Sequence, residues 1–272
     1  ACPESCVFPS ELLKAIDLPA LIPPWIPLLI PLVLAYAPAI APQPDLRPAS
    51  MPNSLSTILG PSITAREKAN KAPIRETLAA GIMSLVPWKP GRILVDPMCG
   101  SGTMLIEAAM MGINMAPGLN REFISEKWRT LDKKIWWDTR KDAFDKIDND
   151  VEFKIYGYDI DEEALEIAKE NAEIAGVDEY IEFKLGNAID FTSDEEYGFI
   201  VTNPPYGERL EDKESVQSLY KHLGYTFRKL KNWSYYLITS YEDFEKEFGQ
   251  EADKRRKLYN GMLKTNLYQY IG

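Results

Sequence analysis

The 272-residue sequence contains little cysteine and little histidine. Its three cysteines, Cys2, Cys6 and Cys99, are too few for a disulfide framework or a four-ligand zinc site. The single histidine, His222, leaves little basis for a histidine metal site or a histidine general base. We therefore expect a cytoplasmic protein without a resident metal ion.

Basic residues are outnumbered by acidic ones. The chain carries 31 Lys and Arg residues against 41 Asp and Glu residues, a net charge of −10. This balance is not typical of a general nucleic-acid binder, and it counts against an RNA substrate. The hydrophobic fraction of 45% and the charged fraction of 26% are those of an ordinary globular protein, and the length suits one large domain or one domain with an appendage.

Residues 18–43 contain no charged side chain, which first suggests a membrane span. Seven prolines interrupt this run, and each interior proline costs a helix roughly 3 kcal/mol or more. The segment also lacks the basic region that precedes the apolar part of a signal peptide. We expect no membrane span, and we divide the chain into a proline-rich apolar segment of unknown role, 1–65, and a folded domain, 66–272.

Strands and helices alternate along the folded domain. Apolar runs predict strands at 92–95, 153–158, 181–185, 199–202 and 234–239. Amphipathic patterns predict helices at 77–85, about 104–112, 162–175 (ended by Gly176) and 215–229. Two last strands, 257–259 and 262–270, flank Asn260-Gly261, a dipeptide typical of a type I′ hairpin. The order predicts an α/β fold with a doubly wound, mostly parallel sheet and a C-terminal antiparallel hairpin.

A long polar and aromatic insert, about 114–150, separates the second predicted helix from the second strand. It contains Trp128, Trp136, Trp137 and a basic cluster of Lys127, Arg129, Lys133, Lys134, Arg140 and Lys141. One interpretation is a helical excursion whose tryptophans cap the core and whose charges face solvent. The other is a wall beside the active site that meets a polyanion.

Polar groups follow the predicted strands at their carboxyl ends, where ligands bind to such sheets. Asp96 and the turn Cys99-Gly100-Ser101-Gly102-Thr103 follow the first strand. The glycines allow close approach of the backbone to a ligand, and the start of the next helix presents free N–H groups. Asp159 follows the second strand, where an acid accepts hydrogen bonds from ribose hydroxyls, and Asn187 follows the third. Together these groups predict a nucleotide-type cofactor site.

The stretch Asn203-Pro204-Pro205-Tyr206 follows the fourth strand and is the predicted reactive end of the site. An Asn carbonyl and the backbone carbonyl of a rigid proline can both accept hydrogen bonds from an exocyclic amine, which orients the nitrogen lone pair toward an electrophilic methyl group. Proximity and in-line orientation then supply most of the catalytic effect without a strong base. Tyr206 offers an aromatic face to a base swung out of its helix. The plainer interpretation is a proline-stiffened turn.

Residues 66–272 resemble the S-adenosylmethionine-dependent methyltransferase domain of the bacterial THUMP-containing 23S rRNA guanine-N2 methyltransferases. The matching stretches are KAPIRE at 71–76, DPMCGSGT at 96–103, NMAPGLNREF at 114–123 and NPPYGER at 203–209. The resemblance implies a Rossmann-like class I fold and S-adenosylmethionine as cofactor, with S-adenosylhomocysteine as product. It also implies methylation of a guanine N2 amine in structured RNA, with 23S rRNA as the first expectation.

The resemblance also assigns roles to individual residues. The methionine part of the cofactor is expected to lie against Arg75, Glu76, Asp96, Cys99, Gly100, Ser101, Gly102 and Thr103. Asp159 with Ile160 is expected to bind the ribose, and Asn187 with Ala188 to meet the adenine. Asn203, which also faces the cofactor, is expected to hold the target base together with Pro204, Pro205 and Tyr206.

Two features depart from the family pattern. Asn187 stands where relatives commonly have an aspartate that accepts from the adenine amine, so we expect weaker cofactor binding. The 65 proline-rich residues contain no recognisable THUMP domain, the RNA-capturing module of the family. Residues 66–272 alone still carry a net charge of −8, so we expect modest affinity for RNA phosphates.

Other functions remain open at this stage. A tRNA guanine is the near alternative to rRNA. Adenine-N6 methylation of DNA and glutamine-N5 methylation of protein use the same Asn-Pro-Pro-Tyr geometry, although residues 116–123 and Gly207-Glu208-Arg209 argue against them. A cofactor-binding module without turnover is a further alternative. The sequence leaves the oligomeric state undetermined.

Overall fold

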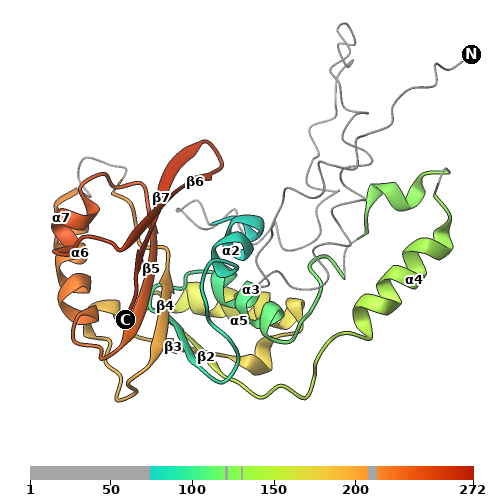
Figure 1. Cartoon of the computed structure of the whole chain (residues 1–272), viewed down its shortest axis with the longest axis horizontal. Coiled ribbons are helices and arrows are strands. Elements are labelled where there is room, and N and C mark those ends of the chain that lie inside the picture. Colours follow the sequence, from blue (N-terminus) through green and yellow to red (C-terminus); the bar gives the residue numbers. More distant parts are fainter. Residues whose placement is uncertain (1–73, 120–121, 130, 208–212) are drawn as a thin grey trace, which may run out of the picture. The chain divides into compact units, whose positions relative to one another are not determined.

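The computed structural model describes residues 74–119, 122–129, 131–207 and 213–272 (Figure 1). All of them belong to one unit of the chain, residues 54–272. The uncharged run 18–43, the predicted boundary at residue 65 and the question of a THUMP domain lie outside the described residues. Across those described ranges, no helix is both long and apolar enough to cross a membrane.

Seven strands form one sheet in the order β3-β2-β1-β4-β5-β7-β6. They are β1 (Ile93–Asp96), β2 (Ile155–Asp159), β3 (Ile181–Leu185), β4 (Gly198–Thr202), β5 (Trp233–Thr239), β6 (Lys254–Asn260) and β7 (Leu263–Tyr270). Strands β1 to β5 are parallel, whereas β7 is antiparallel to β5 and to β6. The predicted doubly wound sheet with a C-terminal antiparallel hairpin is confirmed.

The strand order reverses at β1, which pairs with β2 on one side and β4 on the other. Val95 lies opposite Tyr156 of β2 and Ile200 of β4. The carboxyl ends of these three strands therefore lie side by side, at the position where ligands bind to doubly wound sheets. The polar groups that follow each strand consequently meet at one edge of the sheet.

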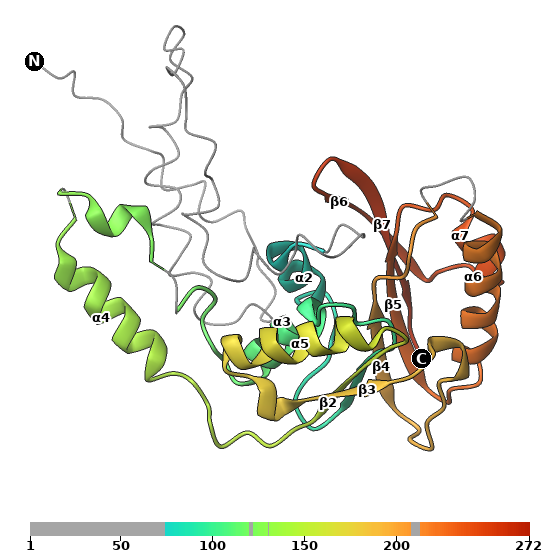
Figure 2. The ribbon, with the colours of Figure 1, turned by 180° about the vertical axis from the view of Figure 1, so that it is seen from behind.

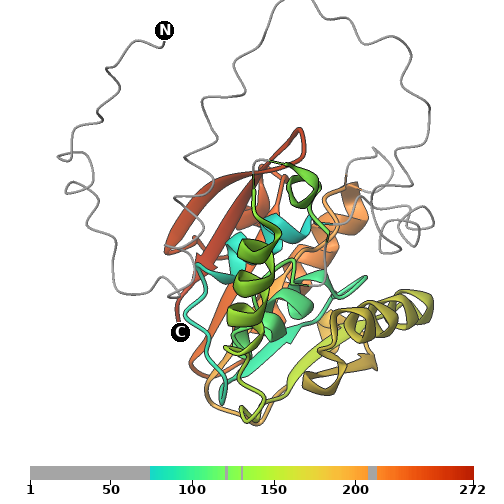
Figure 3. The same cartoon turned by 90° about the vertical axis from the view of Figure 1, so that its right-hand side faces the viewer.

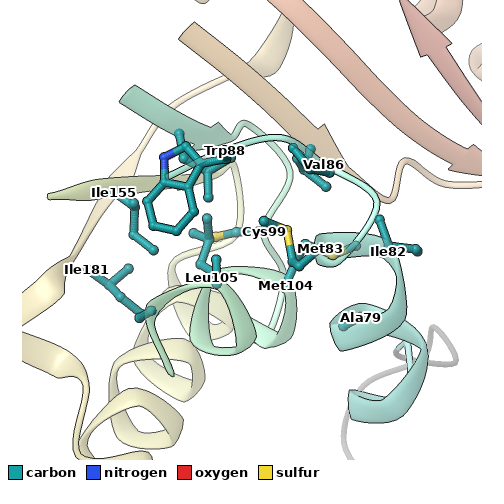
Figure 4. Close-up of a cluster of buried hydrophobic side chains, with 14 of the residues drawn as sticks. Ala79, Ile82, Met83, Val86, Trp88, Cys99, Met104, Leu105, Ile155 and Ile181 are labelled. Atoms are coloured by element: carbon teal, nitrogen blue, oxygen red, sulfur yellow. The ribbon is translucent and has the colours of Figure 1, made fainter. Parts of the chain in front are cut away.

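Helices cover both faces of the sheet. The helices α2 (Glu76–Met83), α3 (Thr103–Gly112) and α5 (Glu162–Ala175) pack on one face, and α6 (Lys213–Phe227) and α7 (Phe244–Phe248) on the other (Figure 2). Figure 4 shows part of the first core, which includes Ile82 of α2, Leu105 of α3 and Ile155 of β2. Burying these apolar stripes contributes most of the stability of each layer.

The local sequence explains where the helices begin and end. In α5, the Asp161 side chain accepts a hydrogen bond from the Glu163 N–H, and Gly176 ends the helix at φ +71°. Its buried residues, Leu165, Ala168 and Ala172, follow the helical repeat. The predicted helices are confirmed, with ends within about two residues of those expected.

The predicted hairpin is confirmed, but its turn is shifted by one residue. Asn260 pairs with Leu263, so the two-residue loop is Gly261-Met262. Gly261 has φ +64°, whereas Met262 is not among the non-glycine residues with positive φ. A type I′ turn requires positive φ at both central positions, so the type I′ prediction is wrong. A glycine at the first central position is instead the pattern of a type II′ turn.

The insert contains a short 3₁₀ helix, η4 (Ile124–Lys127), and the helix α4 (Lys133–Phe144). Helix α4 lies outside the two helix layers in Figures 1 and 2 and in front of the domain in Figure 3. No residue of α4 is buried, and Trp128 and Trp137 are 44% and 64% exposed. Trp136 stacks on Phe123, at 5.6 Å between ring centroids. The expectation of a helical excursion is confirmed, but the tryptophans do not cap the core, because α4 packs on the preceding loop of the insert.

Candidate functional site

The glycine-rich turn joins β1 to α3, and its two glycines meet different surroundings. Gly100 has φ +51° and Gly102 has φ +77°. A Cβ on Gly102 would lie 3.1 Å from Ala168 Cβ and 3.1 Å from Phe183 Cζ, whereas a Cβ on Gly100 would meet nothing within 4 Å. Gly102 therefore allows the turn to pack on α5 and β3. Gly100 leaves open space above the turn, as a backbone cradle for a ligand requires.

Asp159 joins the end of β2 to this turn. Its Oδ2 accepts a hydrogen bond from the Gly100 N–H (2.9 Å), and its Oδ1 accepts one from the Asp161 N–H (3.0 Å). The Cys99 N–H donates to the Tyr158 carbonyl at 2.9 Å. The structure thus brings together two groups that lie 59 positions apart in the sequence and that were both predicted to contact the cofactor.

Asp96 lies beneath the turn and is only 2% exposed. Its Oδ1 accepts a hydrogen bond from the Met98 N–H at 3.1 Å. Burial raises the pKa of Asp96 to about 7, and the negative charge of Asp159 acts in the same direction. A cation bound here would favour the ionised carboxylate, so the site is electrostatically suited to a positively charged ligand.

The remaining residues of the turn contribute mainly through the backbone. The Cys99 side chain lies in the first hydrophobic core, near Leu105 and Met104 (Figure 4), and burial raises the pKa of its thiol well above the ordinary value. The Ser101 carbonyl accepts from Asn171 Nδ2 (3.0 Å), and the Ser101 and Thr103 hydroxyls lie 3.2 Å apart. A direct ligand contact of Cys99 would therefore involve its main chain.

A cavity of about 250 Å³ lies at the carboxyl ends of β2 and β3. Its lining includes Pro97, Tyr158, Asn187, Ala188 and Phe191. The two residues predicted to meet an adenine therefore line one hollow that also reaches the glycine turn through Pro97. The Gly186 N–H donates to the Asp159 carbonyl at 2.9 Å. The cavity therefore lies directly beside Asp159, the residue predicted to bind the ribose.

The Asn203–Tyr206 loop follows β4 at the same edge. The Tyr206 hydroxyl donates to Asn203 Oδ1 at 2.5 Å. The Tyr220 hydroxyl of α6 donates to the Pro205 carbonyl at 2.7 Å and also lies 2.9 Å from Thr239 Oγ1 of β5. The loop is therefore held by Tyr220 of α6, which is in turn bonded to Thr239 of β5. Pro204 is buried.

Tyr220 and Thr239 are parts of this site that the sequence analysis missed. Burial raises the pKa of Tyr220, so its hydroxyl keeps its proton and can donate to the Pro205 carbonyl. In the sequence, Tyr220 is one member of the apolar stripe of α6. No local pattern distinguishes it from a residue that only fills the core.

Arg75 precedes α2 and Glu76 is its first residue. An added Cβ on Gly261 would meet Arg75 Nη2 at 3.7 Å, so the Arg75 guanidinium lies beside the β6–β7 turn. Glu107 of α3 is 7% exposed, and burial, together with the charge of Glu76, raises its pKa to about 7. Glu107 is a further buried acid that the sequence analysis missed. The neighbour of Asp159, Ile160, is 73% exposed.

Comparisons with known proteins agree with this architecture. Residues 64–269 match the family model UPF0020, described as an RMKL-like methyltransferase domain. The putative RNA methyltransferase YpsC of Bacillus subtilis is 50% identical over 199 residues, 73% of this chain and 52% of that protein. The ribosomal RNA large subunit methyltransferase K/L of Shewanella baltica is 40% identical over 220 residues, 77% of this chain and 31% of that protein.

Solved structures give the same result. A possible methylase from Clostridium difficile 630 is 78% identical with a TM-score of 0.74, over 78% of this chain and 56% of that one. SMU.472, a putative methyltransferase complexed with SAH, is 46% identical with a TM-score of 0.71, over 74% and 54% of the two chains. The expected class I methyltransferase fold is confirmed. This chain spans about half the length, or less, of these four proteins.

Proposed function

The chain belongs to the UPF0020 family of RMKL-like methyltransferase domains, and on that premise we propose that it transfers a methyl group from S-adenosylmethionine to RNA. The proposed acceptor is the exocyclic N2 amine of a guanine, with 23S rRNA as the first candidate. The observation that carries the proposal is the meeting of two groups at one sheet edge: the Asp159–Gly100 cradle with its adjoining cavity, and the anchored Asn203–Tyr206 loop.

The residues at the sheet edge fit S-adenosylmethionine. Gly100 leaves space for a close ligand, and the carboxylate of Asp159 lies between the turn and the cavity. Asn187 and Ala188 line the hollow that would take the adenine. The buried Asp96 favours a cationic group nearby. SMU.472, with 46% identity, was solved with SAH, which supports the same cofactor for this chain. When bound, the cofactor supplies an electrophilic methyl group on a positively charged sulfur.

The Asn203–Tyr206 loop would hold the acceptor amine. Asn203 Oδ1 has two lone pairs, so it can accept from the amine while it keeps the Tyr206 hydroxyl at 2.5 Å. A backbone carbonyl of Pro204 or Pro205 is the proposed second acceptor; the Pro205 carbonyl also has a second lone pair beside the one that accepts from Tyr220. The amine proton would leave to solvent. The Tyr206 ring would stack on the target base, and positioning would supply most of the rate enhancement.

The substrate class is part of the proposal. The relative from Shewanella baltica carries the name of a large-subunit rRNA methyltransferase, which supports rRNA, whereas YpsC is named only as a putative RNA methyltransferase. A tRNA guanine and an adenine in DNA are therefore assayed in parallel. A cytoplasmic location also stays a prediction.

The decisive experiment follows labelled methyl transfer from S-adenosylmethionine to unmodified rRNA, tRNA and DNA, with nucleoside analysis of the product. We expect label in N2-methylguanosine from RNA. Asn203→Ala should lower kcat at least about 100-fold because it removes the acceptor that orients the amine. Tyr206→Phe keeps the ring and should lower kcat less.

Two outcomes would overturn the proposal. Label found only in N6-methyladenine would show that the acceptor is an adenine, in DNA or in RNA, and not a guanine. Unchanged kcat in Asn203→Ala would remove this loop from the reaction.

A further inference from the structure

The β6–β7 hairpin extends past the end of β5, beside the Asn203–Tyr206 loop. Asn266 of β7 pairs with Thr239, the last residue of β5, and Thr239 Oγ1 lies 2.9 Å from the Tyr220 hydroxyl that holds Pro205. Residues 257–266 therefore begin at the level of this loop and continue beyond it, by about 10 Å for three further residues of β7. Figures 1 and 2 show the projecting tip.

The charge of the hairpin opposes that of the rest of the chain. Residues 254–272 contain five basic residues (Lys254, Arg255, Arg256, Lys257 and Lys264) and no acidic residue, although the whole chain carries −10. The insert, in contrast, has no net positive charge, because residues 114–150 contain eight basic and eight acidic residues. The hairpin is therefore a basic segment without balancing acids in its own sequence.

One face of the projecting part carries basic and aromatic side chains together. Lys257 and Tyr259 lie two residues apart on β6 and therefore point to the same face of the hairpin. Lys264 of β7 lies opposite Tyr259, so the three side chains share this face. Tyr259 is 56% exposed, and Lys257 Nζ lies 5.2 Å from the centre of its ring. Within the described residues, no carboxylate forms an ion pair with Lys257 or Lys264.

The part of the same face that lies against α7 differs from the projecting tip in charge balance and in exposure. Arg255 Nη1 lies 3.1 Å from Glu245 Oε2 of α7, so its charge is already balanced. Further along β7, Tyr268 and Tyr270 are buried under α7. Only the part of the face that extends beyond this helix combines exposed aromatic surface with unbalanced positive charge.

We propose that this projecting face of the β6–β7 hairpin binds the RNA strand next to the target guanine. Lys257 and Lys264 contact phosphates, and Tyr259 stacks on a flanking base. This inference rests on the proposed RNA methyltransferase function. It accounts for RNA binding by an acidic chain, because the positive charge is concentrated at the position where substrate enters the site.

The chain provides a matched control for the test. Tyr225 of α6 is 61% exposed, and Lys229 Nζ lies 3.8 Å from the centre of its ring. This pair repeats the Lys257–Tyr259 arrangement near the end of α6, at the opposite edge of the sheet from the Asn203–Tyr206 loop. Lys257→Ala with Tyr259→Ala is therefore compared with Lys229→Ala with Tyr225→Ala. Lys264→Ala is a third variant, which removes charge without touching the aromatic ring.

The experiment measures methyl transfer to rRNA against RNA and salt concentration, and direct RNA binding by fluorescence anisotropy. We expect the hairpin double variant to raise KM and Kd for RNA about 10-fold or more, with kcat and S-adenosylmethionine affinity unchanged. Each lost phosphate contact should also reduce the slope of log Kd against log salt by about 0.7 to 0.9. The α6 double variant should match the wild-type chain.

The readouts separate this inference from the proposed function. If the wild-type chain binds RNA but transfers no methyl group, the proposed function fails, and the binding data still test the hairpin. If RNA affinity and salt slope are the same in wild type, the hairpin double variant and Lys264→Ala, the inference is overturned. Absence of any salt-dependent RNA binding by the wild-type chain overturns it as well.

Discussion

Gly100 and Gly102 share a left-handed conformation, but an added methyl group would have different consequences at the two positions. Either substitution by alanine strains the backbone by roughly 1–2 kcal/mol. At Gly102 the new Cβ would also contact Ala168 and Phe183 at 3.1 Å, so we expect a larger loss of unfolding free energy for Gly102→Ala. At Gly100 the Cβ enters open space above the turn, so we expect a smaller stability loss but at least a 10-fold weaker cofactor affinity.

Urea unfolding and titration calorimetry with S-adenosylhomocysteine measure the two effects of the glycine substitutions. Equal stability losses would contradict the packing role of Gly102. Undiminished cofactor affinity in Gly100→Ala would show that the cradle does not lie under the ligand.

Asn187 offers a second test at a single residue. Its Oδ1 accepts a hydrogen bond from the Ile189 N–H at 3.3 Å, and it lines the cavity beside Asp159. An aspartate could keep this bond and would add a negative charge for an adenine amine to donate to. We expect Asn187→Asp to bind S-adenosylmethionine more tightly, by about threefold to tenfold.

The Asn187→Asp variant is checked by calorimetry and by the ligand-induced rise in Tm, since a ligand that binds the folded state stabilises it in proportion to its affinity. Asp190→Asn, which alters another residue of the cavity lining, is the comparison. Unchanged or weaker binding in Asn187→Asp would contradict the prediction.

At the scale of secondary-structure elements, α6 holds the Asn203–Tyr206 loop through Tyr220, and β5 bonds Tyr220 through Thr239. Tyr220→Phe removes the hydroxyl between the Pro205 carbonyl and Thr239 Oγ1. We expect it to lower the unfolding free energy by about 1–3 kcal/mol, because buried polar groups lose their partner. We also expect kcat to fall about 10-fold while cofactor affinity stays the same, because the loop loses its support but the cradle does not.

Tyr235→Phe is the matched control for Tyr220. The Tyr235 hydroxyl donates to the Phe227 carbonyl at 2.8 Å, a buried bond of the same kind at the start of β5. Tyr235→Phe should lower the unfolding free energy by about as much as Tyr220→Phe and leave kcat unchanged. If both variants lowered kcat equally, the effect would follow from lost stability rather than from loop position.

At the scale of the whole molecule, two buried acids should determine part of the dependence of stability on pH. Burial raises the pKa of Asp96 and of Glu107 to about 7. The folded chain therefore binds more protons than the unfolded chain between about pH 4 and 7. The contribution of the two acids to the unfolding free energy is therefore fully present below their pKa in the unfolded chain. This contribution is lost as the pH rises through 7, their pKa in the folded chain.

We therefore expect Glu107→Gln to remove part of this pH dependence. Relative to the wild-type chain, the variant should gain about 2 kcal/mol in unfolding free energy between pH 5 and pH 7. Urea unfolding at pH 5, 6 and 7 checks this, with the exposed Glu170→Gln as control. A constant difference between the variant and the wild type would show that Glu107 is ionised in the folded chain at pH 5.

Charge is distributed unevenly over the whole molecule. The chain is acidic overall, yet its last 19 residues carry five positive charges and no negative one. The net charge argued against nucleic acid when it was considered as a total. Where charges lie relative to the Asn203–Tyr206 loop, however, decides whether they can meet a substrate, and that position depends on strand pairing.

The sequence by itself determined most of the strands and helices, their order and the edge at which the candidate site lies, although it did not predict α7. Hydrophobic periodicity, proline and glycine act over a few residues, so strands such as 181–185 and the end of α5 at Gly176 can be predicted locally. Since parallel strands bring their carboxyl ends together, Asp96, Asp159 and Asn203 could also be predicted to converge.

Only the tertiary structure decided which side chains meet across elements. It directed Cys99 into the core, joined Tyr220 to a carbonyl 15 positions away and left Trp137 exposed. It also moved the hairpin turn by one residue and placed its basic face beyond β5. These outcomes depend on strand register and on packing between segments that are separate in the sequence.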